Sequence, residues 1–178
     1  MFGYDAPRLH AALNDLPAAL LLVAVLFDLG AWVTKRESLK AAALWTLWAG
    51  VIGGWAAVIA GLIAEEAIEH GEAIHDLMER HENLALITMG LFTLVLGWKL
   101  LRRARLTPIE ELALRGASVV GLIGIVWVGA IGGQLVFEHA AGIKSDLLKA
   151  ELRDREASDS SGRGPDHEHA PGTPEHDP

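Results

Sequence analysis

Histidines and carboxylates are the residues of this chain best suited to chemistry. The sequence has eight histidines and no cysteine. Those outside the C-terminal tail are His10, His70, His75, His81 and His139. The acids that accompany them are Asp15, Glu65, Glu66, Glu82 and Glu138. Imidazole and carboxylate are the usual ligands of zinc, copper(II) and non-haem iron when thiolates are absent. These residue types therefore predict a metal site if the fold brings them together.

The same histidines also have a structural interpretation that needs no ligand. Glu72 and His75 have the Glu-x-x-His spacing of di-iron bundles, but those bundles use the motif twice and here it occurs once. The segment that contains His70 and His75 can instead be a solvated acidic helix face. Histidines at a membrane boundary, such as His81, also cap helix ends or extend toward water. A metal site and a polar docking surface both stay open on this pattern.

Composition excludes several classes of protein. Without cysteine there are no disulfides, thiolate metal sites, iron–sulfur clusters or covalently attached haem. The net charge of −8 argues against a nucleic-acid partner. No Ser/His/Asp order, phosphate loop or nucleotide fingerprint is present. The sequence has no catalytic motif and supports no enzyme class.

Four apolar stretches must position these side chains. They cover residues 16–34, 41–64, 83–101 and 116–137, and Asp28 and Lys99 are their only charges. A helix needs roughly 20 apolar residues to cross a hydrocarbon core about 30 Å thick. The sequence therefore predicts an all-α, multi-pass integral membrane four-helix bundle in contact with the lipid bilayer.

The connections between these spans carry helix signals of their own. Apolar residues recur at helical spacing through 65–82, which predicts a continuation of the second helix or a short amphipathic helix after a break at Gly71. A turn near Arg80 would then lead into the third span. Thr107 followed by Pro108 predicts an N-cap with proline at the first helical position.

The end of the chain differs from the rest in composition. From about Glu156 it consists mainly of Ser, Gly, Pro, Asp, Glu and His, without aromatic or branched apolar residues. Such a composition predicts disorder. We therefore expect a transmembrane domain over residues 1–155 and a disordered, acidic, His-containing tail over 156–178.

Small residues predict close helix packing. Gly50, Gly54, Ala57 and Gly61 are spaced by three or four residues on the second span, as Gly129 and Gly133 are on the fourth. Small residues let helix backbones approach each other in lipid. The pattern is consistent with contacts within the bundle or between two chains, so a homodimer is compatible with it.

The basic residues predict the orientation. Eight flank one side of the spans: Lys35, Arg36, Lys40, Lys99, Arg102, Arg103, Arg105 and Arg115. Four lie near the spans on the other side: Arg8, Arg80, Lys144 and Lys149. The positive-inside rule places the richer side in the cytoplasm. Both termini and every histidine then fall on the periplasmic side of a bacterial inner membrane.

Asp28 is the one acid inside a span. An ionisable residue there is costly unless it pairs or faces the bundle, which makes it a functional candidate. It lies near the predicted cytoplasmic boundary. A proton relay is one interpretation. The other is structural, either partial snorkelling or a hydrogen bond to Trp45, Thr46 or Trp48 on the second span.

The chain resembles a bacterial four-span membrane family, catalogued as domain of unknown function 2231, over most of residues 8–144. The motifs that carry the resemblance are Leu9-His10-Ala11, Asp15-Leu16-Pro17, Phe27-Asp28-Leu29, Arg80-His81-Glu82 and the closing Gly132-Gly133-Gln134-Leu135-Val136-Phe137-Glu138-His139-Ala140. Three positions depart from the family pattern. Ala11 replaces a proline, Asp15 replaces a histidine, and Ala140 replaces a glycine.

The resemblance selects a ligand set from the larger group of histidines and acids. It implies His10, Asp15, His81 and His139 as metal ligands. The residue types alone leave further members of the larger group as secondary candidates: Glu65, Glu66, His70, Glu82 and Glu138. The ligand would be zinc, iron, copper or an interfacial b-type haem, the haem held for example by His81 and His139.

The family's modules occur beside c-type cytochrome and Rieske domains, which implies membrane redox work or metal handling. A c-type cytochrome or another membrane redox protein would then be the partner. The alternative function is a non-catalytic assembly or sensor module whose His/acid end is a docking surface.

Overall fold

The structure is a computed structural model that describes residues 6–66, 72–102 and 105–160. Four long helices come first: α1 (Ala6–Thr34), α2 (Glu37–Glu65), α3 (Glu72–Arg102) and α4 (Pro108–Phe137). A shorter helix, α5 (Ser145–Ser160), follows them. The described residues contain no strand, so the predicted all-α class is confirmed.

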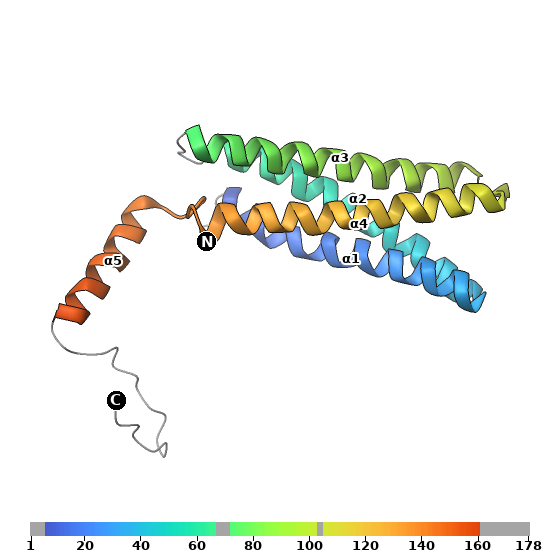
Figure 1. The fold of residues 1–178 in the computed structure, drawn as a ribbon, viewed down its shortest axis with the longest axis horizontal. Coiled ribbons are helices and arrows are strands. Elements are labelled where there is room, and N and C mark those ends of the chain that lie inside the picture. Colours follow the sequence, from blue (N-terminus) through green and yellow to red (C-terminus); the bar gives the residue numbers. More distant parts are fainter. Residues whose placement is uncertain (1–5, 67–71, 103–104, 161–178) are drawn as a thin grey trace, which may run out of the picture. The chain divides into compact units, whose positions relative to one another are not determined.

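The four long helices form an up-and-down bundle (Figure 1). Each packs on two neighbours, in the order α1, α2, α3, α4 around the bundle, so α1 lies diagonally opposite α3. All four are long and apolar enough to cross a membrane. At 1.5 Å per residue each is about 44 Å long, which exceeds the hydrocarbon core. The predicted membrane four-helix bundle is confirmed.

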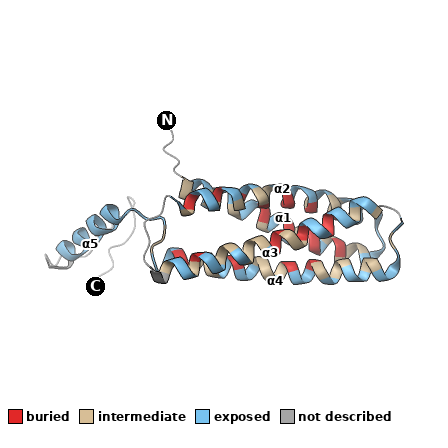
Figure 2. Cartoon of the chain, turned by 90° about the horizontal axis from the view of Figure 1, so that it is seen from above, coloured by how far each residue is buried: buried red, intermediate tan, exposed pale blue. Residues whose placement is uncertain are grey.

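The interior of the bundle is a narrow apolar layer. Leu21, Phe92 and Val95 are its fully buried side chains, and buried residues lie along the inward faces of the four helices (Figure 2). The outward faces are also apolar, for example at Val33 and Leu94, which are 73% and 72% exposed. Such an exterior suits lipid contact.

Glycines on α2 allow close helix packing, whereas some on α4 do not. A Cβ at Gly50 would meet Leu21 at 2.9 Å, and one at Gly54 would meet Met89 at 2.5 Å. Gly129 and Gly133 on α4 have nothing within 4 Å. The α2 stripe therefore has a packing role inside the bundle, and this α4 pair has none against the residues that the structure describes.

The segment before the third span differs from the prediction. α3 begins at Glu72 and continues through Arg80 into the span, so the predicted turn near Arg80 is wrong. The reason is that Met78, which is buried, and His81 continue the inward face of the same helix. The predicted break at Gly71 and the candidate ligand His70 lie outside the described residues.

The predicted start of α4 is confirmed. Thr107 caps the helix with Pro108 at its beginning, and Glu110 completes a capping box. The Thr107 side chain accepts a hydrogen bond from the Glu110 backbone N–H, and the Thr107 backbone N–H donates to the Glu110 carboxylate.

The chain divides into two compact units, residues 1–142 and 143–178. The second contains α5, an exposed helix with an ion pair between Arg155 and Glu151 at 2.9 Å. α5 runs through Ser160, so it includes the first residues of the predicted 156–178 tail. The tail histidines (His167, His169 and His176) lie outside the described residues.

Candidate functional site

His10 lies on the inner side of α1, at the end of the bundle where α1 begins and α4 ends. Its Nδ1 is 2.8 Å from the backbone carbonyl oxygen of Ala57 on α2. Gly61, one turn further along α2, makes room for the ring, because a Cβ there would lie 3.0 Å from His10 Cε1. The carbonyl contact engages Nδ1 and leaves Nε2 as the nitrogen that can bind another group.

His81 lies at the same end of the bundle on α3. Gly132 of α4 faces it, and a Cβ at this glycine would approach His81 Cε1 to 3.1 Å. The ring is partly buried, and its Nδ1 is a buried polar atom with no hydrogen-bond partner among the described residues. An unpaired buried nitrogen costs free energy unless a ligand or water satisfies it.

The two imidazoles meet across the bundle. Their ring centroids are 6.4 Å apart and the ring planes are nearly perpendicular, at 88°. Imidazole is a common metal ligand, so His10 and His81 would be the two residues to hold a metal at this position. α1 and α3 supply the rings, while α2 and α4 supply the glycines beside them. All four helices thus contribute to this pair, which we call the histidine pair.

The other candidate ligands do not join the histidine pair. Asp15 and Glu66 are exposed. The Glu82 carboxyl has Glu65 as its neighbour. No group of three or more His, Asp or Glu in the described ranges lies close enough to hold one metal ion.

His139 lies beyond the end of α4 and is exposed. Its Nδ1 is 3.3 Å from the backbone oxygen of Gln134. Together with Glu138, Asp76 and Arg80 it lines a cavity of about 380 Å³. The resemblance therefore selected four residues, of which the fold brings two into contact.

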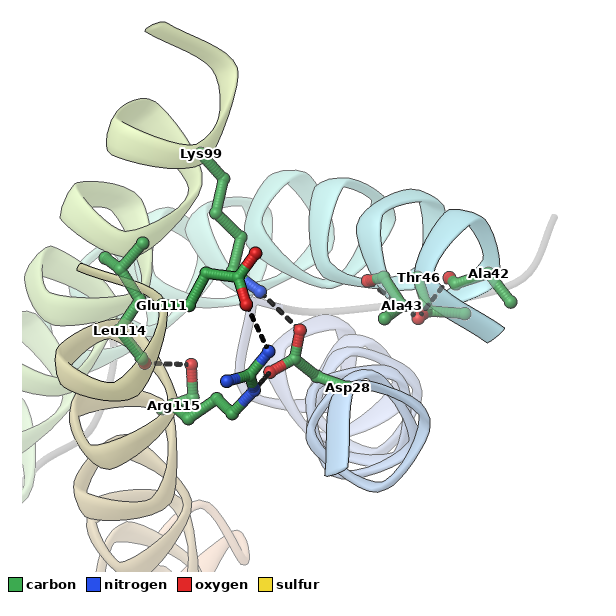
Figure 3. A network of polar contacts seen from close by, with 9 residues as sticks. Asp28, Ala42, Ala43, Thr46, Lys99, Glu111, Leu114 and Arg115 are labelled. Atoms are coloured by element: carbon green, nitrogen blue, oxygen red, sulfur yellow. Dashed lines mark hydrogen bonds and ion pairs between the residues drawn. The ribbon is translucent and has the colours of Figure 1, made fainter. Parts of the chain in front are cut away.

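A second polar cluster lies at the opposite end of the bundle, around Asp28. Lys99 Nζ of α3 is 2.6 Å from Asp28 Oδ1, and Arg115 Nε of α4 is 3.2 Å from Asp28 Oδ2. Arg115 also pairs with Glu111, at 2.9 Å. Figure 3 shows the four side chains converging from three helices. We call these four residues the Asp28 cluster.

The Asp28 cluster is electrically balanced, and it consists of a buried Asp28 with three partly buried partners. Asp28 is 9% exposed, and the side chains of Lys99 and Arg115 are 17% and 16% exposed. Two cations face two carboxylates. The Arg115 guanidinium also lies 5.7 Å from the ring centroid of Trp32. Charged side chains near lipid need partners of opposite charge, because an unpaired charge there costs free energy.

The predicted hydrogen bond from Asp28 to the second span is wrong. The Thr46 hydroxyl donates to backbone oxygens of its own helix, those of Ala42 and Ala43, at 2.8 and 3.2 Å (Figure 3). Asp28 instead pairs with Lys99 and Arg115, whose positions in the sequence indicate only that they flank the spans. Their depth in the membrane region could have identified them, because Asp28, Lys99 and Arg115 each lie within about two turns of a helix terminus at the same end of the bundle.

The sequence profile of a family described as "Predicted membrane protein (DUF2231)" matches residues 6–145. No curated protein and no solved structure matches the chain. The matched range contains α1 to α4, with the histidine pair and the Asp28 cluster. The chain is thus a member of the DUF2231 family of membrane proteins.

Proposed function

We propose that this integral membrane protein holds a metal centre between His10 and His81, in the service of membrane redox work or metal handling. The observation that supports the proposal is the histidine pair itself. Two imidazoles from diagonal helices lie 6.4 Å apart beside two glycines. One buried ring nitrogen has no partner among the described residues.

The number of protein ligands favours haem over a bare ion. Structural zinc takes four protein ligands and catalytic zinc three, whereas the pair offers two. A b-type haem would need only two protein ligands, which His10 and His81 would provide, and histidine is a common haem ligand. A ligating histidine usually engages its other nitrogen with a backbone carbonyl, as His10 does with Ala57. Bound haem would supply reversible electron transfer at this end of the bundle.

The location of the pair fits such a role if the orientation is as the basic residues predict. The end with the histidine pair is then periplasmic and the end with the Asp28 cluster cytoplasmic. The protein would lie in a bacterial inner membrane. A c-type cytochrome or another membrane redox protein could then exchange electrons with a centre near its surface.

The test is the metal and haem content of the full chain, purified in detergent without an affinity tag and after addition of haem. We expect about one iron per chain and a Soret band that is lost in His10→Ala and His81→Ala. The matched control changes His167, His169 and His176 of the tail to alanine and should keep both signals. Stoichiometric metal without a Soret band would indicate a bare ion.

Two outcomes would contradict the metal proposal. One is stoichiometric metal that persists in both His10→Gln and His81→Gln, which keep a polar side chain in the bundle. The other is failure of iron, zinc, copper and haem to bind to the folded wild-type chain. The second outcome would favour the docking module, for which the cavity lined by Asp76, Arg80, Glu138 and His139 offers a surface of mixed charge.

A further inference from the structure

The basic end of the bundle contains a cavity distinct from the histidine pair. It has a volume of about 580 Å³ and lies where α1 connects to α2 and where α4 begins. The Asp28 cluster forms part of its wall. A cavity of this size is within the range of ligand sites. Its lining combines charged and apolar groups.

The charge of this lining is positive. The Asp28 cluster adds no net positive charge to the lining, because its two cations face its two carboxylates. Lys35, Arg36 and Lys40 line the same cavity, with Glu37 as the one acid among them. None of the three has an ion-pair partner in the part of the chain that is described. The surplus cations are therefore available for an anion.

The apolar part of the lining lies at the edge of the membrane. Leu44, Leu100 and Leu106 line the cavity together with Trp32. Trp32 is 48% exposed and Trp98, near the same end, is 47% exposed. Exposed tryptophans near helix ends mark the boundary between hydrocarbon and headgroups. A ligand here would have a phosphate against the lysines and an apolar portion against the leucines.

We propose that this cavity binds the headgroup of an anionic phospholipid. The ligand chemistry is a phosphate held by Lys35, Arg36 and Lys40, with acyl chains along the apolar lining. Basic pockets between membrane helices bind anionic headgroups for the same electrostatic reason. A free phosphate ion shares the polar chemistry but has no use for the apolar lining, so the lipid is the better match.

The local backbone tolerates substitution of the three cations. Lys35 has a left-handed conformation, with φ of 57°, where glycine is favoured. Arg36 is the N-cap of α2 and makes no side-chain capping bond, so serine suits this position better than arginine. Lys40 is exposed on the first turns of α2. The triple variant Lys35→Gly/Arg36→Ser/Lys40→Gln therefore removes three cations without straining the fold.

The experiment measures retention of added lipid by the full chain, using native mass spectrometry with dioleoyl phosphatidylglycerol and dioleoyl phosphatidylcholine as probes. We expect the wild-type chain to retain phosphatidylglycerol in preference to phosphatidylcholine. The triple variant should weaken phosphatidylglycerol binding by about fivefold per cation removed. The control Lys144→Gln/Lys149→Gln/Arg153→Gln removes the same charge from the segment around α5 and should bind as the wild type does.

Three results would overturn the proposal. The first is equal retention of the two lipids by the wild-type chain. The second is an equal loss of binding in the triple variant and its control, which would indicate a non-specific charge effect. The third is displacement of phosphatidylglycerol by inorganic phosphate at a similar concentration, which would indicate a free-anion site. Circular dichroism of each variant verifies that the helices are retained.

Discussion

Asp28 is a buried acid whose two cationic partners come from two other helices. Its contacts with Lys99 at 2.6 Å and Arg115 at 3.2 Å cross the bundle from α1 to α3 and α4. Such a set adds little net stability over apolar packing, but loss of one member leaves charges buried without a partner. At the scale of single residues, Asp28 therefore specifies how three helices meet.

We expect Asp28→Asn to lower the free energy of unfolding by about 3 kcal/mol, because it leaves Lys99 and Arg115 without their shared carboxylate. The measurement is unfolding by SDS in mixed micelles, followed by circular dichroism. The control is Glu151→Gln, which removes the acid of an exposed ion pair on α5 and should change stability by less than about 0.5 kcal/mol. Equal effects of the two substitutions would refute a structural role for Asp28.

Ala140 is a residue in a conformation that favours glycine. Its φ is 53°, and its backbone N–H donates to the carbonyl of Val136 at 3.0 Å as α4 ends. This is the position at which a left-handed residue terminates a helix. The resemblance to the family expects glycine here, and the backbone supplies the physical reason.

Ala140→Gly should stabilise the protein by roughly 1 kcal/mol, because it relieves the left-handed conformation of a residue with a Cβ. Thermal unfolding in detergent measures the change. The neighbouring Ala141→Gly is the matched control, since Ala141 does not have a positive φ. That substitution should leave stability unchanged or reduce it, by up to about 1 kcal/mol. A loss of stability in both variants would contradict the argument.

At the scale of the elements, glycines decide how closely the helices pack. Gly121 of α4 lies against Phe92 of α3, and a Cβ there would be 2.8 Å from the ring. Phe92 is fully buried, so the ring has no free space to move into. Gly129, two turns further along α4, has nothing within 4 Å.

The two glycines therefore predict opposite effects of the same substitution. Gly121→Ala should destabilise the bundle by about 1–3 kcal/mol through overpacking against Phe92. Gly129→Ala should be neutral or stabilise α4 by up to about 1 kcal/mol, because alanine favours the helix. Unfolding in SDS distinguishes them. If Gly129→Ala were the more damaging change, α4 would have a partner outside this chain.

At the scale of the whole bundle, the two polar sites are related by helix geometry. Eighteen residues separate His10 from Asp28 on α1, and the same number separates His81 from Lys99 on α3. Eighteen residues make five helical turns, so each pair of residues shares one face of its helix at a separation of about 27 Å. This is close to the thickness of a hydrocarbon core. The polar groups therefore lie at its two boundaries, with the layer around Leu21 and Phe92 between them.

The sequence predicted the local features of this architecture and missed the contacts between helices. The spans follow from apolar runs that contain almost no charge, and the Thr107 cap follows from four adjacent residues. The partners of Asp28 depend on the register of three helices, which no local pattern contains. The predicted ligand set also depends on the fold, because His139 lies past the last turn of α4 and does not face inward. An inventory of residues by depth and helix face would have identified the histidine pair.

The orientation of the bundle is testable with unusual clarity because the chain has no native cysteine. Ser38 and Ser145 are exposed residues; in the sequence, the first lies beside the basic loop before α2 and the second follows the end of α4. The excess of lysine and arginine around Ser38 predicts that it is cytoplasmic. Ser145→Cys should therefore react with a membrane-impermeant maleimide in intact spheroplasts. Ser38→Cys should react only after permeabilisation, and the reverse pattern would place the histidine pair on the cytoplasmic side.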